Sequence, residues 1–356
     1  MAAELALFDR FPELVGRIPR HPLLEGPTPV APLALPGVAD LWVKHDERST
    51  PAYGGNKPRK LEFLIGEACA AGARRLVTSG GLATNHGLAT ALLGRGAGLA
   101  TTVVLVDQPV TDAVRRQLRL LQGAGAKLRH GGSVAGAARE GVSELARSWL
   151  AGERPRLVPA GGSSPVGTLG FVSAGLELGE QVRAGVLPEP RRVFVPIGSG
   201  GTLAGLVVGF ALAGLGTRVV GVLVTDILPP SPRRLAKLAA STLRLLRRHA
   251  PNAPELAIGA ESFERITDQL GDGYGAATPA AREAVAAARE RGLALETTYT
   301  GKTLAALREA ARRGALDGPT LFWNTYNAVD VAAALAPLPE PSQLPAPFQR
   351  LFGGGS

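Results

Sequence analysis

The strongest constraint on the fold is a regular alternation of strand-like and helix-like segments that begins near residue 57. Short apolar runs alternate with longer segments whose apolar residues recur at helical spacing. Strands that alternate with helices of this length form parallel sheets covered on both faces. The strand-like segments are 75–79, 101–106, 127–129, 157–159, 192–197, 218–224 and 320–323, and the predicted helices are 58–71, 85–96, 111–124, 135–150, 166–184 and 201–213. We therefore expect an α/β fold whose ligand sites lie in the loops that precede helices.

Length and composition limit the classes of function. The 356 residues are enough for two modest domains or one large one, and no apolar run reaches membrane-spanning length. The first ten residues include Glu4, Asp9 and Arg10 and lack the basic-then-apolar order of a signal peptide. Cys69 is the only cysteine, which excludes an internal disulfide and a cysteine-based metal cluster. We expect a cytoplasmic location, no membrane partner and no metal.

The net charge of +9 raises the question of nucleic-acid binding. The arginines are scattered, however, and the densest cluster, at 244–249, is typical of the solvated face of one helix. Few aromatic residues lie among these arginines. We expect no nucleic-acid partner, because a basic balance fits an anionic cofactor and carboxylate substrates equally well.

Lys57 is the first candidate for chemistry. The chain has six lysines against thirty-three arginines, and only a lysine can lose its proton near neutral pH or bind a carbonyl carbon through its amine. Gly54, Gly55 and Asn56 precede Lys57, and Pro58 suits the first position of a helix. The alternative is a solvated surface lysine. Lys60, one helical turn on, is expected to point to solvent.

A glycine-rich loop follows the strand-like segment 192–197 and begins the helix at 201–213. Its residues are Gly198, Ser199, Gly200, Gly201 and Thr202. Glycines allow close backbone approach, and the start of a helix presents free N–H groups to a phosphate. The spacing completes neither a dinucleotide fingerprint nor a Walker loop. A single phosphate is the best ligand, and a plain tight turn is the alternative.

Two further groups of residues are candidates. Thr84, Asn85 and His86 lie in a second strand-to-helix loop that offers N–H groups to a carboxylate, and His86 is either catalytic or a capping residue. Tyr274 and Tyr299, two of only four tyrosines, lie in glycine-flanked loops. A tyrosine beside a cationic cofactor can acquire a lowered pKa and act as an acid or base, although an isolated tyrosine is more often structural.

These segments together resemble the pyridoxal-phosphate enzymes of the 1-aminocyclopropane-1-carboxylate (ACC) deaminase and D-cysteine desulfhydrase family. The resemblance runs from about residue 11 to about residue 334, and the segment G-G-N-K-x-R-K-L-E at 54–62 is its most specific part. The other matching segments are 26–29, 44–47, 84–86, 159–163, 198–202, 274–275 and 299–302.

The resemblance implies a tryptophan synthase β-like (type II) fold with two open parallel-sheet domains. Residues 1–53 and 164–345 would form a large domain that holds the cofactor phosphate, residues 54–163 a small domain, and residues 346–356 a flexible tail. The cofactor would be pyridoxal 5′-phosphate, and a homodimer is expected.

The resemblance also assigns roles to single residues. Lys57 would bind the cofactor covalently, the loop from Gly198 to Thr202 would hold its phosphate, and Asn85 would contact the ring oxygen. Thr325 would lie beside the cofactor ring. Thr84, Asn85 and His86 would bind the substrate carboxylate, with Tyr274 and Tyr299 flanking the substrate as catalytic residues.

The chain departs from the family pattern in places that affect the substrate. Gln-Ser-Asn of the family is Ala83-Thr84-Asn85 here, His-Thr-Gly-Gly is Asn324-Thr325-Tyr326-Asn327, and the Asp-Pro before the second tyrosine is replaced around Thr297 and Thr298. ACC deaminases carry glutamate directly after the second tyrosine and leucine in the later segment, where this chain has Thr300 and Thr325. The resemblance therefore favours β-elimination from a small, D-configured amino acid such as D-cysteine, which gives a 2-oxo acid and ammonia. The alternatives are ACC ring opening, β-replacement, racemisation, and a pyridoxal-phosphate binding protein without activity.

Overall fold

The computed structural model describes residues 5–353, which form two compact units. Unit 1 contains residues 5–18, 22–63 and 163–328, and unit 2 contains residues 19–21, 64–162 and 329–353. The helices are α1 Ala6–Arg10, α2 Asn56–Ala70, α3 Asn85–Gly96, α4 Asp112–Gly123, α5 Val134–Leu150, α6 Pro165–Arg183, α7 Gly201–Ala213, α8 Pro232–His249, α9 Pro279–Arg289, α10 Thr300–Arg312, α11 Val331–Ala334 and α12 Ala346–Gln349. The strands are β1 Val30–Pro32, β2 Leu41–His45, β3 Arg75–Gly81, β4 Ala100–Val106, β5 Lys127–Gly132, β6 Pro155–Leu157, β7 Arg192–Ile197, β8 Arg218–Leu223, β9 Phe263–Ile266 and β10 Thr320–Asn324.

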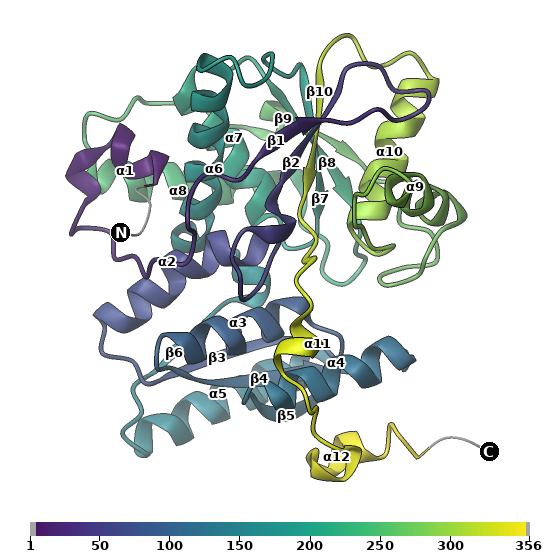
Figure 1. Ribbon diagram of the computed structural model, residues 1–356. Coiled ribbons are helices and arrows are strands. Elements are labelled where there is room, and N and C mark those ends of the chain that lie inside the picture. The colour runs from purple at the N-terminus through teal and green to yellow at the C-terminus, as the bar shows by residue number, and fades with distance from the viewer. Residues whose placement is uncertain (1–4, 354–356) are drawn as a thin grey trace. The chain divides into compact units, whose positions relative to one another are not determined.

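Unit 1 is built around a six-stranded sheet in the order β1-β2-β10-β7-β8-β9. All neighbouring pairs are parallel except β1 with β2. Helices α6, α7 and α8 cover one face of this sheet, and α9 and α10 cover the other (Figure 1). Side chains alternate between the faces: Val193 and Val195 pack toward α6 and α7, whereas Phe194 packs toward α10. Both faces are therefore apolar, as a parallel sheet requires.

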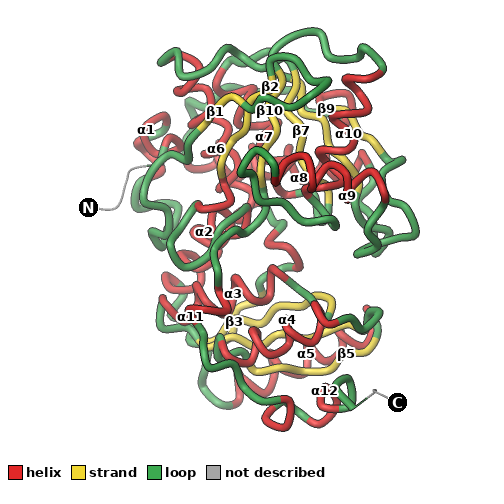
Figure 2. Tube along the Cα trace, turned by 45° about the vertical axis from the view of Figure 1, so that its right-hand side comes forward, coloured by secondary structure: helices red, strands yellow, loops and turns green. Residues whose placement is uncertain are grey.

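Unit 2 contains a four-stranded parallel sheet in the order β5-β4-β3-β6. Figure 2 shows its strands in yellow with α3, α4 and α5 packed against them. In the part of the chain that the structure describes, no helix has the length and apolar character needed to cross a membrane.

The expected α/β architecture with parallel sheets is confirmed, and each predicted helix and strand has a counterpart within a few residues. Several elements were not predicted, notably β1, β2, β9, α9 and α10. The burial pattern of β9, one buried residue followed by three partly buried ones, explains why neither strand alternation nor an apolar run was visible there.

The compact units differ from the expected domain ranges at two places. Residues 54–63 belong to unit 1, because Arg59 forms ion pairs with Asp46 and Glu177 of that unit. Residues 329–353 belong to unit 2, where Arg119 donates to the carbonyl oxygen of Pro339 at 2.7 Å. The division into two domains with the expected ranges stays a prediction.

The expected flexible tail over 346–356 begins with helix α12, in which the Phe348 side chain is buried. Arg115 also donates to the carbonyl oxygen of Leu351 at 2.7 Å. Residues 346–353 are therefore part of the packed structure of unit 2, and residues 354–356 lie outside the described residues.

Candidate active site

The loop that carries Lys57 passes close to two other backbone segments. A Cβ atom on Gly54 would collide with the carbonyl oxygen of Glu47, and one on Gly55, where φ is +80°, would collide with that of Thr325. Glycine is the residue that tolerates both the close approach and the left-handed backbone. The two glycines therefore bring Lys57 against the ends of β2 and β10.

The Lys57 amine lies in the first turn of α2 and is only partly exposed. Its Nζ donates to Asn56 Oδ1 at 2.8 Å, and Asn56 Nδ2 donates to Thr202 Oγ1 at 3.1 Å. Burial lowers the pKa of Lys57 to about 8, and the nearby Glu296 carboxylate opposes this shift. The amine is thus connected to the glycine loop and holds a substantial uncharged fraction near neutral pH.

The glycine loop, Gly198–Thr202, has the shape of an anion site. Gly200, the N-cap of α7, has φ of +91° and has no side chain of its own to cap the helix. The backbone N–H of Gly201 donates to Ser163 Oγ at 3.0 Å, and that oxygen lies 2.7 Å from Ser199 Oγ. Hydroxyl groups and backbone N–H groups therefore converge at the positive end of a helix, which fits a phosphate group.

Lys60 also lies at this loop, so the expectation that it points to solvent is wrong. Its side chain is 2% exposed, and its Nζ lies 5.9 Å from the centre of the Phe171 ring. A Cβ atom added to Gly201 would lie 3.1 Å from that Nζ. Burial, followed by the charge of Lys57, lowers the pKa of Lys60 well below its usual value. An anion beside it would favour its charged form.

Tyr274 and Tyr299 come from different loops of unit 1 and meet through their phenol groups. Their hydroxyl oxygens are 2.5 Å apart, and their rings are edge-to-face with centres 5.9 Å apart. A Cβ atom on Gly198 would lie 3.4 Å from Tyr299 Cε1, which places this ring beside the glycine loop. Burial raises the pKa of both phenols. This direction is opposite to the lowering expected beside a cation, so the protein alone keeps both phenols protonated.

Glu296 is a residue whose role the sequence did not reveal. Its carboxylate accepts the backbone N–H groups of Thr298, Tyr299 and Thr300 at 2.7, 2.8 and 2.9 Å. The hydroxyl of Thr300 also donates to this carboxylate at 3.2 Å. Thr300 is fully buried, and its hydroxyl therefore serves the start of α10. The Thr300 hydroxyl is thus engaged by Glu296, and the substrate preference that the resemblance drew from Thr300 stays a prediction.

The departures after β10 lie directly against the Lys57 loop. The side-chain oxygen of Asn327 accepts the backbone N–H of Gly54 at 2.6 Å. The carbonyl oxygen of Thr325 accepts the backbone N–H of Asn56 at 3.3 Å, so Thr325 contacts this loop through its backbone. The backbone N–H of Tyr326 donates to the side chain of Asn324 at 3.2 Å. Asn324 and Asn327, which depart from the family pattern, therefore add side-chain hydrogen bonds near Lys57.

A buried ionic cluster anchors α2 just beyond Lys57. Arg59 is 1% exposed and donates to Asp46 Oδ1 and Glu177 Oε2, each at 2.8 Å. Lys44, which is fully buried, forms an ion pair with the same Glu177 carboxylate. These opposite charges compensate one another in a site that excludes water. They fix the start of α2 to the sheet of unit 1.

The residues expected to bind the substrate carboxylate lie in unit 2. Thr84 is the N-cap of α3, and its hydroxyl accepts the backbone N–H of Gly87 at 3.1 Å. Asn85 is exposed and His86 is buried. Lys57, Thr325, the glycine loop and both tyrosines belong to unit 1. The expected roles of Thr84, Asn85 and His86 in substrate and cofactor binding stay predictions.

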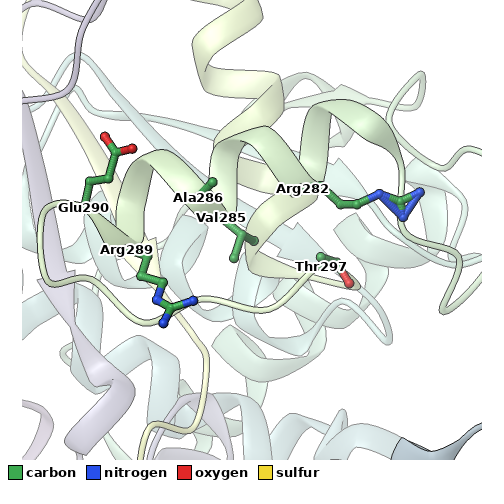
Figure 3. Close-up of a pocket in the computed structure, with 6 residues that line it drawn as sticks. All are labelled: Arg282, Val285, Ala286, Arg289, Glu290 and Thr297. Atoms are coloured by element: carbon green, nitrogen blue, oxygen red, sulfur yellow. The ribbon is translucent and has the colours of Figure 1, made fainter.

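A separate pocket of about 550 Å³ lies on α9, and none of the residues predicted to do chemistry lines it. Figure 3 shows its lining residues, with two arginines on the helix and one threonine from the following loop: Arg282, Val285, Ala286, Arg289, Glu290 and Thr297. The described residues contain no group of three or more His, Cys, Asp or Glu side chains suited to a metal ion.

Comparison with known proteins identifies relatives along almost the whole chain. The sequence model of a family described as pyridoxal-phosphate-dependent enzymes matches residues 22–325. Nocardicin C-9′ epimerase of Nocardia uniformis subsp. tsuyamanensis is 34% identical over 91% of this chain and 98% of the relative. D-cysteine desulfhydrase of Klebsiella pneumoniae is 33% identical over 88% of this chain and 95% of the relative.

Two further relatives agree. The 1-aminocyclopropane-1-carboxylate deaminase of Burkholderia vietnamiensis is 32% identical over 90% of this chain and 97% of the relative. A crystal structure described as an ACC deaminase homologue superposes with a TM-score of 0.77 at 28% identity, and covers 92% of this chain and 96% of that chain. The predicted fold class and resemblance are confirmed.

Proposed function

Because this chain belongs to the pyridoxal-phosphate-dependent enzymes, we propose that it deaminates a small amino acid by β-elimination, with a D-amino acid such as D-cysteine as the substrate. The products would be a 2-oxo acid, ammonia and the group that leaves from the β-carbon. The observation that carries the proposal is the partly buried Lys57 amine, which Asn56 connects to Thr202 of the glycine loop. Relatives described as D-cysteine desulfhydrases support the substrate class.

The residues of unit 1 divide into those that hold the cofactor and those that move protons. Gly198–Thr202 and Lys60 would hold the phosphate, and Lys57 would hold the cofactor's aldehyde carbon. Bound pyridoxal phosphate withdraws electrons from the substrate and thereby acidifies its Cα–H bond. Once the substrate amine has replaced it on the cofactor, the freed Lys57 amine, whose pKa burial lowers to about 8, is suited to accept that proton near neutral pH.

The paired phenols of Tyr274 and Tyr299 are suited to donate rather than to accept. One hydroxyl donates to the other across 2.5 Å, and burial keeps both protonated. The pair therefore offers one hydrogen-bond donor to a substrate. A departing β-substituent that gains negative charge is the group that such a donor would stabilise.

A panel of substrates tests the proposed reaction. D-cysteine, L-cysteine, β-chloro-D-alanine and ACC are supplied in turn, and 2-oxo acid formation is measured. We expect turnover of the D-amino acids to exceed that of ACC and no turnover by Lys57→Ala. Faster turnover of ACC would establish ring opening instead, and silence on all four compounds would refute the proposed substrate class.

Epimerisation is a second candidate, since the 34% identical relative from Nocardia is described as an epimerase. The amine of Lys57 and the protonated phenols provide one group that accepts a proton and another that donates one. The two reactions differ in D₂O. Epimerisation exchanges the Cα hydrogen for deuterium and inverts the centre without forming a 2-oxo acid, whereas elimination forms the 2-oxo acid.

We also propose that the chain acts as a cytoplasmic homodimer. Helix α5 of unit 2 exposes Val142, Trp149 and Leu150, which are 67%, 61% and 90% exposed. These positions share one face of the helix, and exposed aromatic residues of this kind are enriched at protein interfaces. Light scattering, which measures mass in solution, tests the dimer: a monomer mass at micromolar concentration would exclude it.

A further inference from the structure

Tyr274 lies in a loop of unit 1. No helix or strand occurs between β9, which ends at Ile266, and α9, which begins at Pro279. Tyr299, in contrast, is the N-cap of α10 and is held there by Glu296. The phenol–phenol hydrogen bond therefore depends on what fixes the loop that carries Tyr274.

Lys302 connects the two tyrosines. It lies on α10 one turn after Tyr299, and its side chain is fully buried. Its Nζ donates to the carbonyl oxygen of Leu270 at 2.6 Å and to that of Gly273 at 3.2 Å. Gly273 directly precedes Tyr274. A single ammonium group thus joins the helix of one tyrosine to the loop of the other.

The same loop is held from a second direction by Asp226. The carboxylate oxygen Oδ1 accepts the backbone N–H of Tyr274 at 3.0 Å. Gly273 has φ of +129°, and a Cβ atom there would lie 2.9 Å from Asp226 Oδ2. The backbone around Tyr274 is therefore fixed by Lys302 through carbonyl groups and by Asp226 through an N–H group.

Lysine suits the geometry at position 302 better than arginine would. An ammonium group is compact and has three donors that can reach carbonyl oxygens in different directions, whereas a guanidinium group is planar and larger. Burial lowers the pKa of Lys302, and the carboxylates of Glu296, Asp226 and Asp272 act in the opposite direction. Any substitution that removes the ammonium leaves two carbonyl oxygens without this donor.

We propose that Lys302 is a positioning residue that sets the hydrogen bond between Tyr274 and Tyr299. Its consequence for catalysis rests on the proposed function, in which these phenols face the substrate. Its consequence for the tyrosines does not, because it rests on contacts between groups of the protein itself. The two claims can be tested separately.

The direct test uses fluorine NMR of protein labelled with 3-fluorotyrosine. The chain has four tyrosines, so four signals are expected, and single Tyr→Phe variants assign them. Lys302→Met keeps most of the side-chain volume and removes the donors. We expect it to move the signals of Tyr274 and Tyr299 and to leave those of Tyr53 and Tyr326 in place. Lys237→Met, which changes an exposed lysine on α8, is the matched control and should move none.

A second variant keeps the test decisive if Lys302→Met does not fold. Asp226 is exposed, so Asp226→Ala removes the other anchor of the same loop without opening the core. We expect it to move the Tyr274 signal. An unchanged Tyr274 signal in Asp226→Ala, unchanged signals of both tyrosines in folded Lys302→Met, or equal movement of all four signals would overturn the proposal.

Kinetics give the second readout. If the phenols act on the substrate, Lys302→Met lowers kcat by about tenfold, the loss expected for one or two misplaced hydrogen bonds. KM and cofactor attachment to Lys57 should change little, which separates misplacement of the tyrosines from general damage. An unchanged kcat together with moved tyrosine signals would refute the catalytic part alone. If the wild-type protein turns over none of the amino acids, the proposed function fails while the NMR result still decides the role of Lys302.

Discussion

The pKa of Lys57 leads to a quantitative prediction about how the protein acquires its cofactor. An ordinary lysine titrates near 10.5, whereas burial lowers the pKa of Lys57 to about 8. At pH 7 about one Lys57 amine in ten is then uncharged, against roughly one in three thousand for an ordinary lysine. Only the uncharged amine attacks an aldehyde. Attachment of pyridoxal phosphate to the apoprotein should therefore be faster at pH 7 than for an unperturbed lysine, by up to about 300-fold, since a less basic amine is also a weaker nucleophile.

The pH profile tests this reasoning. The rate of attachment, followed by stopped-flow absorbance, should rise about tenfold per pH unit below pH 8 and level off above it. Glu296→Gln should move the midpoint to lower pH, because the Glu296 carboxylate raises the pKa of Lys57. The amide oxygen of glutamine can still accept the backbone N–H groups of Tyr299 and Thr300, which share one oxygen of Glu296, whereas the N–H of Thr298 loses its acceptor.

Glu290→Gln removes an exposed carboxylate directly after α9 and serves as the control. It should leave the profile unchanged. A wild-type midpoint near 10.5, or an upward shift in Glu296→Gln, would show that burial and the Glu296 charge do not control this amine.

Two further predictions concern the surroundings of Lys57. Gly201→Asp should weaken pyridoxal-phosphate binding in equilibrium dialysis by a factor of ten or more, roughly 1.4 kcal/mol. The reason is that a side chain at this position meets Ser163 and Lys60 and adds a negative charge to the start of the helix. Gly141→Asp, at a position with open space, is the control, and equal affinities of the two variants would place the phosphate elsewhere. Glu177→Gln should lower the free energy of unfolding in urea by about 3–5 kcal/mol, because it leaves the buried charges of Lys44 and Arg59 undercompensated, whereas Glu180→Gln, at an exposed position of the same helix, should change it little.

The sequence predicted the architecture well because parallel sheets leave a clear pattern. Both faces of β7 and β8 are buried, so these strands appear as continuous apolar runs between helices. Phe263–Ile266 and Pro279–Arg289 were not predicted, since β9 has one buried residue and α9 is mostly alanine and arginine. Such segments take their structure from the sheet on which they pack, and local pattern does not show that sheet.

Only part of the candidate site was predicted from the sequence. Lys57, Thr202 and the two tyrosines were all named from local sequence, and the structure connects Lys57 to Thr202 and joins Tyr274 to Tyr299. Lys60 was misplaced although helical spacing puts it on the same side as Lys57, since residues three apart share a face. That spacing was the signal that could have found it.

The contact between Glu296 and Thr300 could not be predicted from the sequence. A threonine after a tyrosine gives no indication of where its hydroxyl points, and here that hydroxyl donates to the Glu296 carboxylate, four residues earlier, at 3.2 Å. The substrate preference that the resemblance drew from Thr300 and Thr325 therefore stays a prediction. The proposed D-amino-acid substrate depends on the relatives described as D-cysteine desulfhydrases, and the phenol pair supports the elimination step.

The few lysines of this chain occupy positions with distinct physical requirements. Among thirty-three arginines the chain keeps six lysines, and four of them lie in unit 1 at positions that are buried or partly buried: Lys44, Lys57, Lys60 and Lys302. Lys44 and Lys302 donate to carbonyl oxygens from fully buried positions, at 2.7 Å to Thr28 and 2.6 Å to Leu270. A planar guanidinium would not fit such sites, and at Lys57 it could not supply a nucleophilic amine. Lysine therefore meets two separate physical requirements, the nucleophilic amine that the proposed function needs at Lys57 and the compact ammonium group at Lys44 and Lys302. A scarce residue type in a biased sequence accordingly identifies structural anchors as well as reactive groups, and burial together with hydrogen-bond partners distinguishes the two.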